Sequence, residues 1–363
     1  MPSVLCVVGA RPNFVKMAPV QRALEALGVA APLLHTGQHY DRILSDSVME
    51  QLGLPAPAHH LGVGSGSHAE MTAAVMVGVE RVLLETPFDA ILVPGDVNST
   101  LGAGLAAAKL GVPVIHLEAG LRSRDWTMPE EINRVLVDRL SDLLLVHCEE
   151  AIANLAAEGV EADRIAFVGN TMIDSLFTLL PVARATGARE RLGLDAQGYV
   201  LVTLHRPALV DDPERLGAAL GVLRDVAGGI PVVFPVHPRT RARLEHAGID
   251  LGGVVALPPI EYLEFACLQA DARLVVTDSG GVQEETSALG VPCLTYRRTT
   301  ERPVTITHGT NRLVGLDPDR QRAACREALA TPMPAAAPQI PLWDGRAGER
   351  AAAAIATLID VSP

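Results

Sequence analysis

Residues 279–286 place two glycines and two carboxylates where an apolar run stops and a helix would begin. Backbone N–H groups at a helix N-terminus bind phosphate, and the glycines after Ser279 would let a phosphate come close to them. Glu284 or Glu285, one turn into the helix, would then bind ribose hydroxyls. A nucleotide site is one interpretation of this segment. The other is a plain strand-to-helix turn, in which Ser279 caps the helix and acidic residues of the first turn favour its dipole.

A second candidate site follows an apolar run at residues 4–8. The chain turns at Gly9, and Arg11 and Lys16 bring positive charge to the carboxyl end of the strand predicted there. Open α/β sheets bind anionic ligands at that end of their strands. The spacing fits neither the Gly-x-Gly-x-x-Gly fingerprint nor a P-loop, so it indicates neither a standard dinucleotide cofactor nor ATP.

Further polar residues in the first half follow predicted strand ends. Asp96 stands at the tip of one strand, and His116 and Glu118 leave the end of the next. Neighbouring strand ends of a doubly wound sheet face the same crevice. The structural alternative for Asp96 is a capping or turn residue. For Glu118 it is an internal ion pair with Arg122 or Arg124.

Two His/Arg pairs in the second half also follow predicted strands. They are His205 with Arg206, and His237 with Arg239. A lone histidine after a strand is usually structural, but two such pairs on adjacent strand ends indicate a pocket for phosphates or sugar hydroxyls. No His, Cys or carboxylate set has metal-binding spacing, and no Ser/His/Asp set sits on a nucleophile elbow.

The composition excludes several classes of function. Hydrophobic residues make up 48% of the 363 residues and aromatic residues 3%, so stacking platforms for bases are scarce. A net charge of −12 without a long Lys/Arg run argues against nucleic acid as the main partner. The five cysteines are dispersed, which predicts reduced, mostly buried thiols and a cytoplasmic protein. Neither a signal peptide nor a run long enough to span a bilayer is present, so no membrane role is expected.

Strand and helix patterns alternate along the whole chain, which predicts an α/β protein with parallel sheets. Apolar runs typical of buried parallel strands occur at residues 4–8, 90–93, 112–116, 143–146, 199–203, 232–234 and 274–276. Helical patterns lie between them, for example at residues 101–110 and 132–140.

The length suits two domains, and the boundary is predicted near residue 169. A helix and the turn-rich residues 194–198 precede a fresh strand in the second half. The prediction is a first domain at residues 1–168 and a second at 169–345. A C-terminal helix at about 346–363 is expected to pack back on the first domain.

Ten motifs in register give the chain a resemblance to one family. They resemble, in the same order, those of the non-hydrolysing UDP-N-acetylglucosamine 2-epimerases, and they span almost the whole chain. The motifs lie at residues 9–16, 36–39, 95–96, 116–122, 129–134, 169–174, 205–206, 235–237, 277–285 and 300–303. The resemblance implies two Rossmann-like domains in the glycosyltransferase-B arrangement, an active site in the cleft between them, and a homodimer. It also implies interconversion of UDP-GlcNAc and UDP-ManNAc with no cofactor, neither NAD nor metal.

The resemblance also implies roles for single residues, carried over motif by motif. Acid/base roles fall on Asp96, Glu118 and Glu130, and His205 is the fourth catalytic position. The residues expected to bind substrate are Arg11, Lys16, Arg134, His237, Phe265, Ser279, Gly280, Gly281, Glu285 and Arg302. Among these, Glu285 is expected at the ribose and Phe265 near the uracil.

The chemistry of the sugar agrees with this set of residues. The C2 proton has no adjoining carbonyl, so direct deprotonation and reprotonation would face a prohibitive barrier. The route implied by the resemblance is elimination of UDP to 2-acetamidoglucal, followed by re-addition on the other face. That route needs carboxylates near C2 and C3 and cations on the departing diphosphate, and the chain offers both. Which carboxylate removes the C2 proton stays open.

Other substrates and classes also stay open. Residues 38–41 and 205–211 differ from the patterns of well-known bacterial members, which leaves allosteric activation by a second UDP-GlcNAc undecided. The substrate could also be a UDP-sugar with a 3-acetamido group or an oxidised C6. A hydrolysing epimerase, a UDP-sugar glycosyltransferase and a non-catalytic binder are the remaining alternatives. A glycosyltransferase would need an acceptor cleft in the first domain, where this chain has three carboxylates suited to proton transfer. A non-catalytic binder would bury those carboxylates beside a diphosphate at a cost in free energy.

Overall fold

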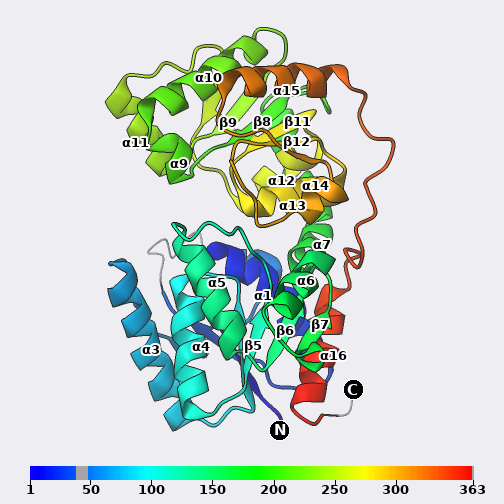
Figure 1. The fold of residues 1–363 in the computed structure, drawn as a ribbon. Helices are drawn as coiled ribbons and strands as arrows, with labels where there is room; N and C mark the ends of the chain where they lie inside the picture. Colours follow the sequence, from blue (N-terminus) through cyan, green and yellow to red (C-terminus); the bar gives the residue numbers. More distant parts are fainter. Residues whose placement is uncertain (38–47, 362–363) are drawn as a thin grey trace. The chain divides into compact units, whose positions relative to one another are not determined.

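The computed structural model describes residues 1–37 and 48–361, apart from the side chain of Arg11. The chain divides into two compact units. Unit 1 comprises Met1–Thr178 and Pro341–Pro363, and unit 2 comprises Leu179–Ile340. The division falls between Thr178 and Leu179, within helix α7 (Thr171–Ala185), whereas the boundary was predicted at residue 169, just before this helix (Figure 1).

Unit 1 is built on a sheet of seven parallel strands in the order β3-β2-β1-β4-β5-β6-β7. The strands are β1 (Val4–Val8), β2 (Leu33–His35), β3 (His59–His60), β4 (Ala90–Pro94), β5 (Val114–Leu117), β6 (Leu143–Val146) and β7 (Ile165–Phe167). In chain order, β2 and β3 extend the sheet on one side of β1, and β4 then lies on the opposite side of β1. Ligands of open α/β sheets bind at this reversal, beyond the carboxyl ends of the two central strands. In unit 1 these strands are β1 and β4.

The helices of unit 1 cover a sheet whose central strands are fully buried, as continuous apolar sequences predict. They are α1 (Arg11–Ala26), α3 (His68–Glu85), α4 (Asn98–Leu110), α5 (Pro129–Leu140), α6 (Glu149–Ala157), α7 and α16 (Ala347–Leu358), with a 3-10 turn at Ala162–Arg164. The C-terminal helix α16 packs closely on α1, since a Cβ added at Gly348 would lie 2.7 Å from the Pro19 backbone. Asp174 of α7 accepts the Gly348 N–H at 2.7 Å.

Unit 2 repeats the same chain order in a sheet of six parallel strands, β10-β9-β8-β11-β12-β13. Its strands are β8 (Val200–Thr203), β9 (Val232–Pro235), β10 (Val255–Leu257), β11 (Leu274–Thr277), β12 (Cys293–Thr295) and β13 (Asn311–Leu313). Its helices are α8 (Ala188–Arg191), α9 (Pro207–Val210), α10 (Pro213–Ala227), α11 (Pro238–Ala247), α12 (Tyr262–Ala270), α13 (Gly280–Leu289), α14 (Val304–Thr307) and α15 (Pro318–Ala330). The reversal lies between β8 and β11.

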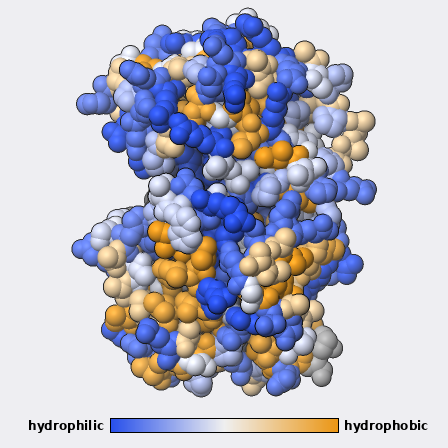
Figure 2. All heavy atoms as spheres, viewed as in Figure 1, coloured by the Kyte–Doolittle hydropathy of each residue, from blue (hydrophilic) through white to orange (hydrophobic). Residues whose placement is uncertain are grey.

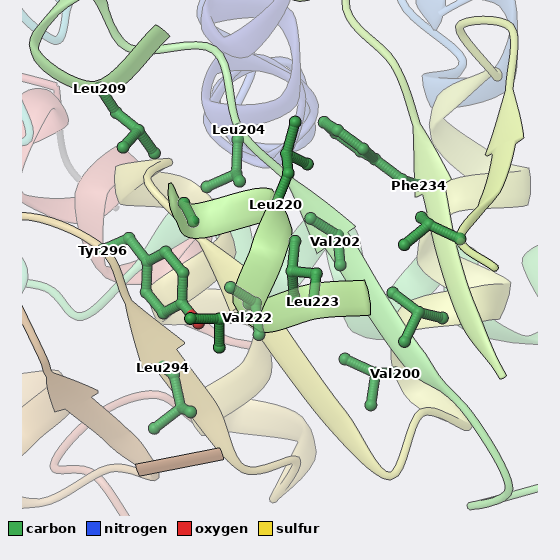
Figure 3. Close-up of a cluster of buried hydrophobic side chains, with 14 of the residues drawn as sticks. Val200, Val202, Leu204, Leu209, Leu220, Val222, Leu223, Phe234, Leu294 and Tyr296 are labelled. Atoms are coloured by element: carbon green, nitrogen blue, oxygen red, sulfur yellow. The ribbon is translucent and has the colours of Figure 1, made fainter. Parts of the chain in front are cut away.

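A continuous apolar core holds the unit 2 sheet to its helices. Val200 and Val202 of β8 pack with Leu220 of α10, and all three side chains are fully buried (Figure 3). Tyr296, after β12, closes the same cluster and is 1% exposed. Burying a side chain of this size stabilises a fold by roughly 1.5–3 kcal/mol, so this core fixes the strands that end at the candidate site.

The predicted strands and helices are confirmed, with small shifts at their ends. The helix predicted at residues 101–110 begins at Asn98, and the one at 132–140 begins at Pro129. Proline at the first position and glutamates in the first turn start a helix before its apolar pattern begins. Strands of two or three residues, such as β2 and β3, are too short for periodicity to predict.

The thiols agree with the sequence prediction. All five cysteines are free and buried. Burial raises the pKa of Cys6 to about 12, so this thiol stays protonated and unreactive. No helix in the described part of the chain is long and apolar enough to cross a membrane.

Candidate active site

At the reversal in unit 1, Asn13 joins the loop after β1 to the end of β4. Its Oδ1 accepts the N–H groups of Gly9 and Ala10 at 3.1 and 2.9 Å, and its Nδ2 donates to the Pro94 carbonyl at 3.3 Å. A Cβ added at Gly9 would lie 2.4 Å from Ser99 Oγ, so only glycine fits there. The two central strand ends are therefore fixed against each other.

Lys16 of α1 forms an ion pair with Glu118, which follows β5, and each side chain is 10% exposed. Glu118 has a φ of 72°, a left-handed conformation that non-glycine residues seldom adopt and that tends to occur at functional sites. A Cβ added at Gly95 would lie 3.2 Å from Lys16 Nζ and 3.4 Å from Glu118 Oε2. Three predicted motifs thus meet at one point. The alternative pairing with Arg122 is not observed, because Arg122 pairs with Asp138 and Glu158.

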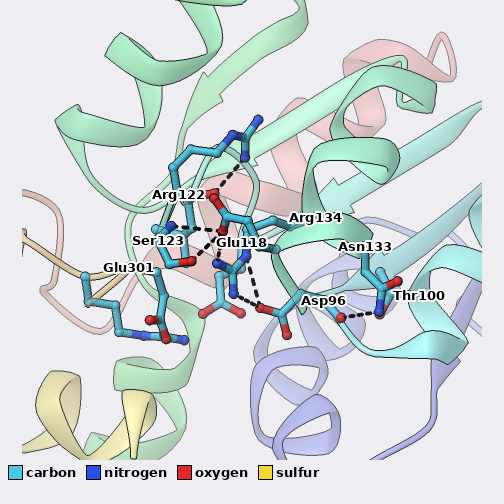
Figure 4. Close-up of polar contacts among 12 residues, drawn as sticks. Asp96, Thr100, Glu118, Arg122, Ser123, Asn133, Arg134 and Glu301 are labelled. Carbon is cyan, nitrogen blue, oxygen red and sulfur yellow. Dashed lines mark hydrogen bonds and ion pairs between the residues drawn. The ribbon is translucent and has the colours of Figure 1, made fainter. Parts of the chain in front are cut away.

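Asp96 is held by the first turns of α5. Arg134 donates from Nε to Asp96 Oδ2 at 3.2 Å and also forms an ion pair with it through Nη2 (Figure 4). Asn133 Nδ2 donates to the Asp96 carbonyl at 2.9 Å. The Asp96 side chain keeps 25% exposure, so this carboxylate is oriented and still accessible.

The adjacent glutamates of α5 have different surroundings. Glu131 is 1% exposed and accepts hydrogen bonds from the backbone N–H of Ser123 at 2.9 Å and of Arg124 at 2.7 Å. It also accepts from Arg134 Nη1 at 2.5 Å. Glu130 is partly exposed and makes no hydrogen bond or ion pair among the described residues. Glu131 therefore supports the fold, and Glu130 has its oxygens available for proton transfer.

His116 is completely buried beneath this group of side chains. Its Nδ1 lies 2.6 Å from Asp138 Oδ1, and its Nε2 lies 2.8 Å from the Gly95 carbonyl oxygen. Asp138 also accepts the Gly120 N–H at 3.1 Å. His116 and Asp138 thus fix the turns on either side of Asp96 and Glu118, and they have no exposed atom with which to contact a substrate.

In unit 2, the glycines after β11 begin helix α13 against a buried arginine. A Cβ added at Gly280 would lie 2.4 Å from Arg302 Nη1. Arg302 Nε lies 2.8 Å from Glu284 Oε2, and Glu284 is fully buried. Ser279 stands at the N-cap but makes no capping hydrogen bond through its side chain. The capping alternative is therefore not observed, and Glu284 serves as a partner of Arg302.

Glu285 is held at the same helix start by a tyrosine. Tyr262 Oη donates to Glu285 Oε1 at 2.9 Å, and Glu285 is 4% exposed. Phe265 lies one turn beyond Tyr262 on α12 and is partly exposed. The residue expected at the ribose is thus bonded to α12, the helix that also carries the residue expected near the uracil.

Asp278 fixes the loop after β8, which carries His205. It is fully buried and accepts the backbone N–H groups of His205 at 2.8 Å and of Arg206 at 2.7 Å. His205 Nδ1 lies 3.3 Å from Asp278 Oδ1, and the His205 and His237 rings are 5.6 Å apart. A carboxylate at Nδ1 orients an imidazole and supports its charged form.

The sequence matches a family model described as UDP-N-acetylglucosamine 2-epimerase over residues 22–356. The chain belongs to this epimerase family. UDP-2,3-diacetamido-2,3-dideoxy-D-glucuronate 2-epimerase from Pseudomonas aeruginosa is 43% identical over 331 residues, which cover 90% of this chain and 92% of the relative. The UDP-N-acetylglucosamine 2-epimerase of Methanocaldococcus jannaschii is 40% identical over 327 residues, which cover 85% and 87%.

Solved structures of the epimerase family confirm the fold class. The M. jannaschii enzyme in complex with UDP-GlcNAc and UDP has a TM-score of 0.88 at 38% identity, covering 96% of this chain and 98% of that one. The Neisseria meningitidis enzyme bound to UDP-GlcNAc has a TM-score of 0.86 at 29% identity, covering 99% and 100%. A glycosyltransferase of kitacinnamycin is 14% identical with a TM-score of 0.57, which shows a shared fold alone.

Sequence reasoning missed several residues that position the site of this epimerase-family chain. Asn13, Asp138, Tyr262 and Asp278 are buried and contact predicted site residues or their loops. Of these four residues, only Asp278 could have been identified from the sequence, because it directly precedes Ser279 at the end of a predicted strand. Two predicted features lie outside the described residues, namely the side chain of Arg11 and residues 38–41, which include the second half of the motif at 36–39.

Proposed function

We propose that this protein is a non-hydrolysing epimerase that interconverts UDP-GlcNAc and UDP-ManNAc by elimination and re-addition of UDP. The observation that carries the proposal is a trio of carboxylates in a member of this family: Asp96 and Glu118 on loops after β4 and β5, and Glu130 in the first turn of α5. The names of the relatives at 36–43% identity support the reaction type.

The reaction divides into two steps with balanced charges. In the first, a base takes the C2 proton, the C1–O bond breaks with its electron pair going to UDP, and a C1–C2 double bond forms. In the second, an acid protonates C2 on the opposite face and the diphosphate oxygen adds to C1. General acid/base groups typically contribute about 10²–10⁴-fold to such steps.

Unit 1 is proposed to supply the proton transfers. Glu118 is paired with Lys16 and Asp96 with Arg134, so both carboxylates are held in position by cations. Glu130 has no such partner among the described residues, which leaves it to exchange protons with the sugar or solvent.

Unit 2 is proposed to bind UDP and to stabilise it as the leaving group. The backbone N–H groups at the start of α13 would receive the diphosphate, and Glu285, held by Tyr262, would bind the ribose hydroxyls. His205, oriented by Asp278, would donate to the phosphate that departs from C1.

A modified sugar is the second candidate substrate. The P. aeruginosa relative at 43% identity is named for a UDP-2,3-diacetamido glucuronate, which carries a C6 carboxylate. If this is the substrate class, kcat/KM for such a sugar should exceed that for UDP-GlcNAc by tenfold or more. Equal or lower values would leave UDP-GlcNAc as the substrate.

A homodimer and a cytoplasmic location complete the proposal. Figure 2 shows hydrophobic side chains gathered over α4 and α5. Ile132 and Leu136, one turn apart on α5, are 40% and 46% exposed, and Val77 of α3 is 56% exposed. An exposed apolar surface of this kind supports association of two copies. Light scattering should give twice the chain mass of 38.3 kDa, and a monomer at micromolar concentration would contradict the dimer.

The reaction itself is tested by product analysis. Purified protein incubated with UDP-GlcNAc alone should give UDP-ManNAc, seen by its anomeric proton in NMR. Free ManNAc with UDP as the only products would assign the protein to the hydrolysing class instead. No conversion of UDP-GlcNAc or of its 3-acetamido and uronate derivatives would refute the epimerase proposal.

A further inference from the structure

Unit 2 contains an arginine-lined pocket that none of the predicted site residues lines. Its volume is about 550 Å³, and it lies beyond the carboxyl ends of β12 and β13, next to the first turn of α15. This volume lies within the roughly 300–1,000 Å³ of small-molecule pockets, so the pocket has room for a small anionic group.

The pocket carries a strong positive charge in a protein whose net charge is −12. Four arginines line it, namely Arg215, Arg297, Arg298 and Arg320. The one carboxylate in the lining is Asp317, whose Oδ1 already accepts the Arg320 backbone N–H at 2.9 Å as the cap of α15.

The four arginines differ in whether they form an ion pair with a carboxylate. Arg215 pairs with Asp212 at 3.1 Å, and Arg297 pairs with Glu301 at 2.6 Å. The side chains of Arg298 and Arg320 are exposed and make no ion pair within the described chain. Two guanidinium groups without a carboxylate, at the mouth of a pocket, are suited to bind the oxygens of a carboxylate or phosphate.

One ion-pair chain connects this pocket to the nucleotide loop. Glu301 accepts from Arg297 at both of its carboxylate oxygens and also forms an ion pair with Arg302 through Oε1. Arg302 in turn lies against Gly280 at the start of α13. Two ion pairs therefore link the pocket to the arginine that lies against the loop proposed to hold UDP.

We propose that this pocket binds the anionic group of a small molecule, a carboxylate or a phosphate, through Arg298 and Arg320. The group belongs either to the sugar of a UDP-uronate bound at the adjacent loop or to a separate phosphorylated molecule. The inference stands independently of the epimerisation, because it concerns binding alone.

Calorimetry with two probes tests the pocket and distinguishes the sources. In one arm, inorganic phosphate is titrated into UDP-saturated protein, so that the diphosphate site is already filled. In the other, UDP-glucuronate is compared with UDP-glucose, which differs only at C6. Both arms use the wild type, the double variant R298Q/R320Q and the control R312Q, whose arginine is exposed on β13 outside the pocket lining.

The double variant should weaken binding at least tenfold in one arm, while R312Q leaves it unchanged. Loss confined to UDP-glucuronate assigns the pocket to a nucleotide-sugar carboxylate, and loss of phosphate binding assigns it to a separate phosphorylated molecule. The proposal is overturned if the double variant, folded with an unchanged melting temperature, matches the wild type in both arms. It is also overturned if the wild type neither binds phosphate nor prefers UDP-glucuronate over UDP-glucose.

Discussion

In unit 1 the polar side chains at the reversal of strand order are mainly carboxylates, such as Asp96 and Glu118, each held by a cation. In unit 2 the same topological position carries helix-end N–H groups, His205 and Arg302. Both sheets have the same strand order around their reversal, so topology determines where each site lies. The loop residues differ between the two units, and this difference is the basis for proposing proton transfer in unit 1 and anion binding in unit 2.

The largest effect is expected when proton transfer is removed from unit 1 alone, which tests whether the two units have separate roles. Glu130→Gln keeps the size of the side chain but cannot carry the proton, so turnover should fall by about 10²–10⁴-fold. UDP affinity by calorimetry should stay within about twofold of wild type, because the nucleotide is assigned to unit 2. Glu149→Gln, the same change in the exposed first turn of α6, should retain full turnover. A large loss of UDP affinity in Glu130→Gln would undo the division of roles.

The reciprocal test removes anion and ribose contacts from unit 2. Arg302→Ala and Glu285→Ala should each weaken UDP binding by about 1.5–3 kcal/mol, the usual loss for a hydrogen bond to a charged group. Arg312→Ala removes an exposed arginine paired with Glu327 and should leave UDP affinity unchanged. Melting curves check folding, since Arg302 is buried beside Glu284. Wild-type UDP affinity in both test variants would remove the assignment.

A smaller effect is expected where one residue only positions another. Tyr262→Phe removes the 2.9 Å hydrogen bond to Glu285, so UDP affinity should fall by about 0.5–1.5 kcal/mol. Tyr199→Phe, which removes a buried hydroxyl bonded to the Leu268 carbonyl in the same unit, serves as the matched control. It should lower stability without changing UDP affinity. Equal affinity losses in the two variants would mean that Tyr262 acts through the fold alone.

The smallest effect concerns the joint between α7 and α16 in unit 1. Burial raises the pKa of Asp174 above its ordinary value, although the N–H of Gly348 opposes the shift. The folded state then binds the proton more tightly than the unfolded state, so this group loses stabilising effect as pH rises above the ordinary carboxyl pKa. Asp174→Asn cannot titrate, so its melting temperature relative to wild type should rise between pH 4 and 7. A constant or falling difference would contradict this.

The strands and the site loops were largely predictable because buried parallel strands are continuous apolar runs. The polar residues of a site loop come directly after such a run in the sequence. Gly95 and Asp96, for example, follow β4 without a gap. The pairing of Glu118 with Lys16 was not predictable, since it joins residues 102 positions apart on α1 and after β5.

Two adjacent glutamates show the other limit of sequence reasoning. Nothing in the local pattern separates Glu130 from Glu131, because both favour the start of a helix equally. Only the fold of residues 123–124 over α5 makes Glu131 a buried acceptor. The same holds in unit 2, where Arg302 engages Glu284 and Tyr262 engages Glu285.

The most direct test of the elimination mechanism is the fate of the C2 hydrogen in D2O. If carboxylates of unit 1 remove and return a proton, the epimerised product should carry deuterium at C2, measured by NMR and mass spectrometry. Prolonged incubation should also release traces of UDP and 2-acetamidoglucal. Retention of the original hydrogen at C2 in the epimerised product would contradict the account, because it would require a hydride transfer or reaction at another carbon.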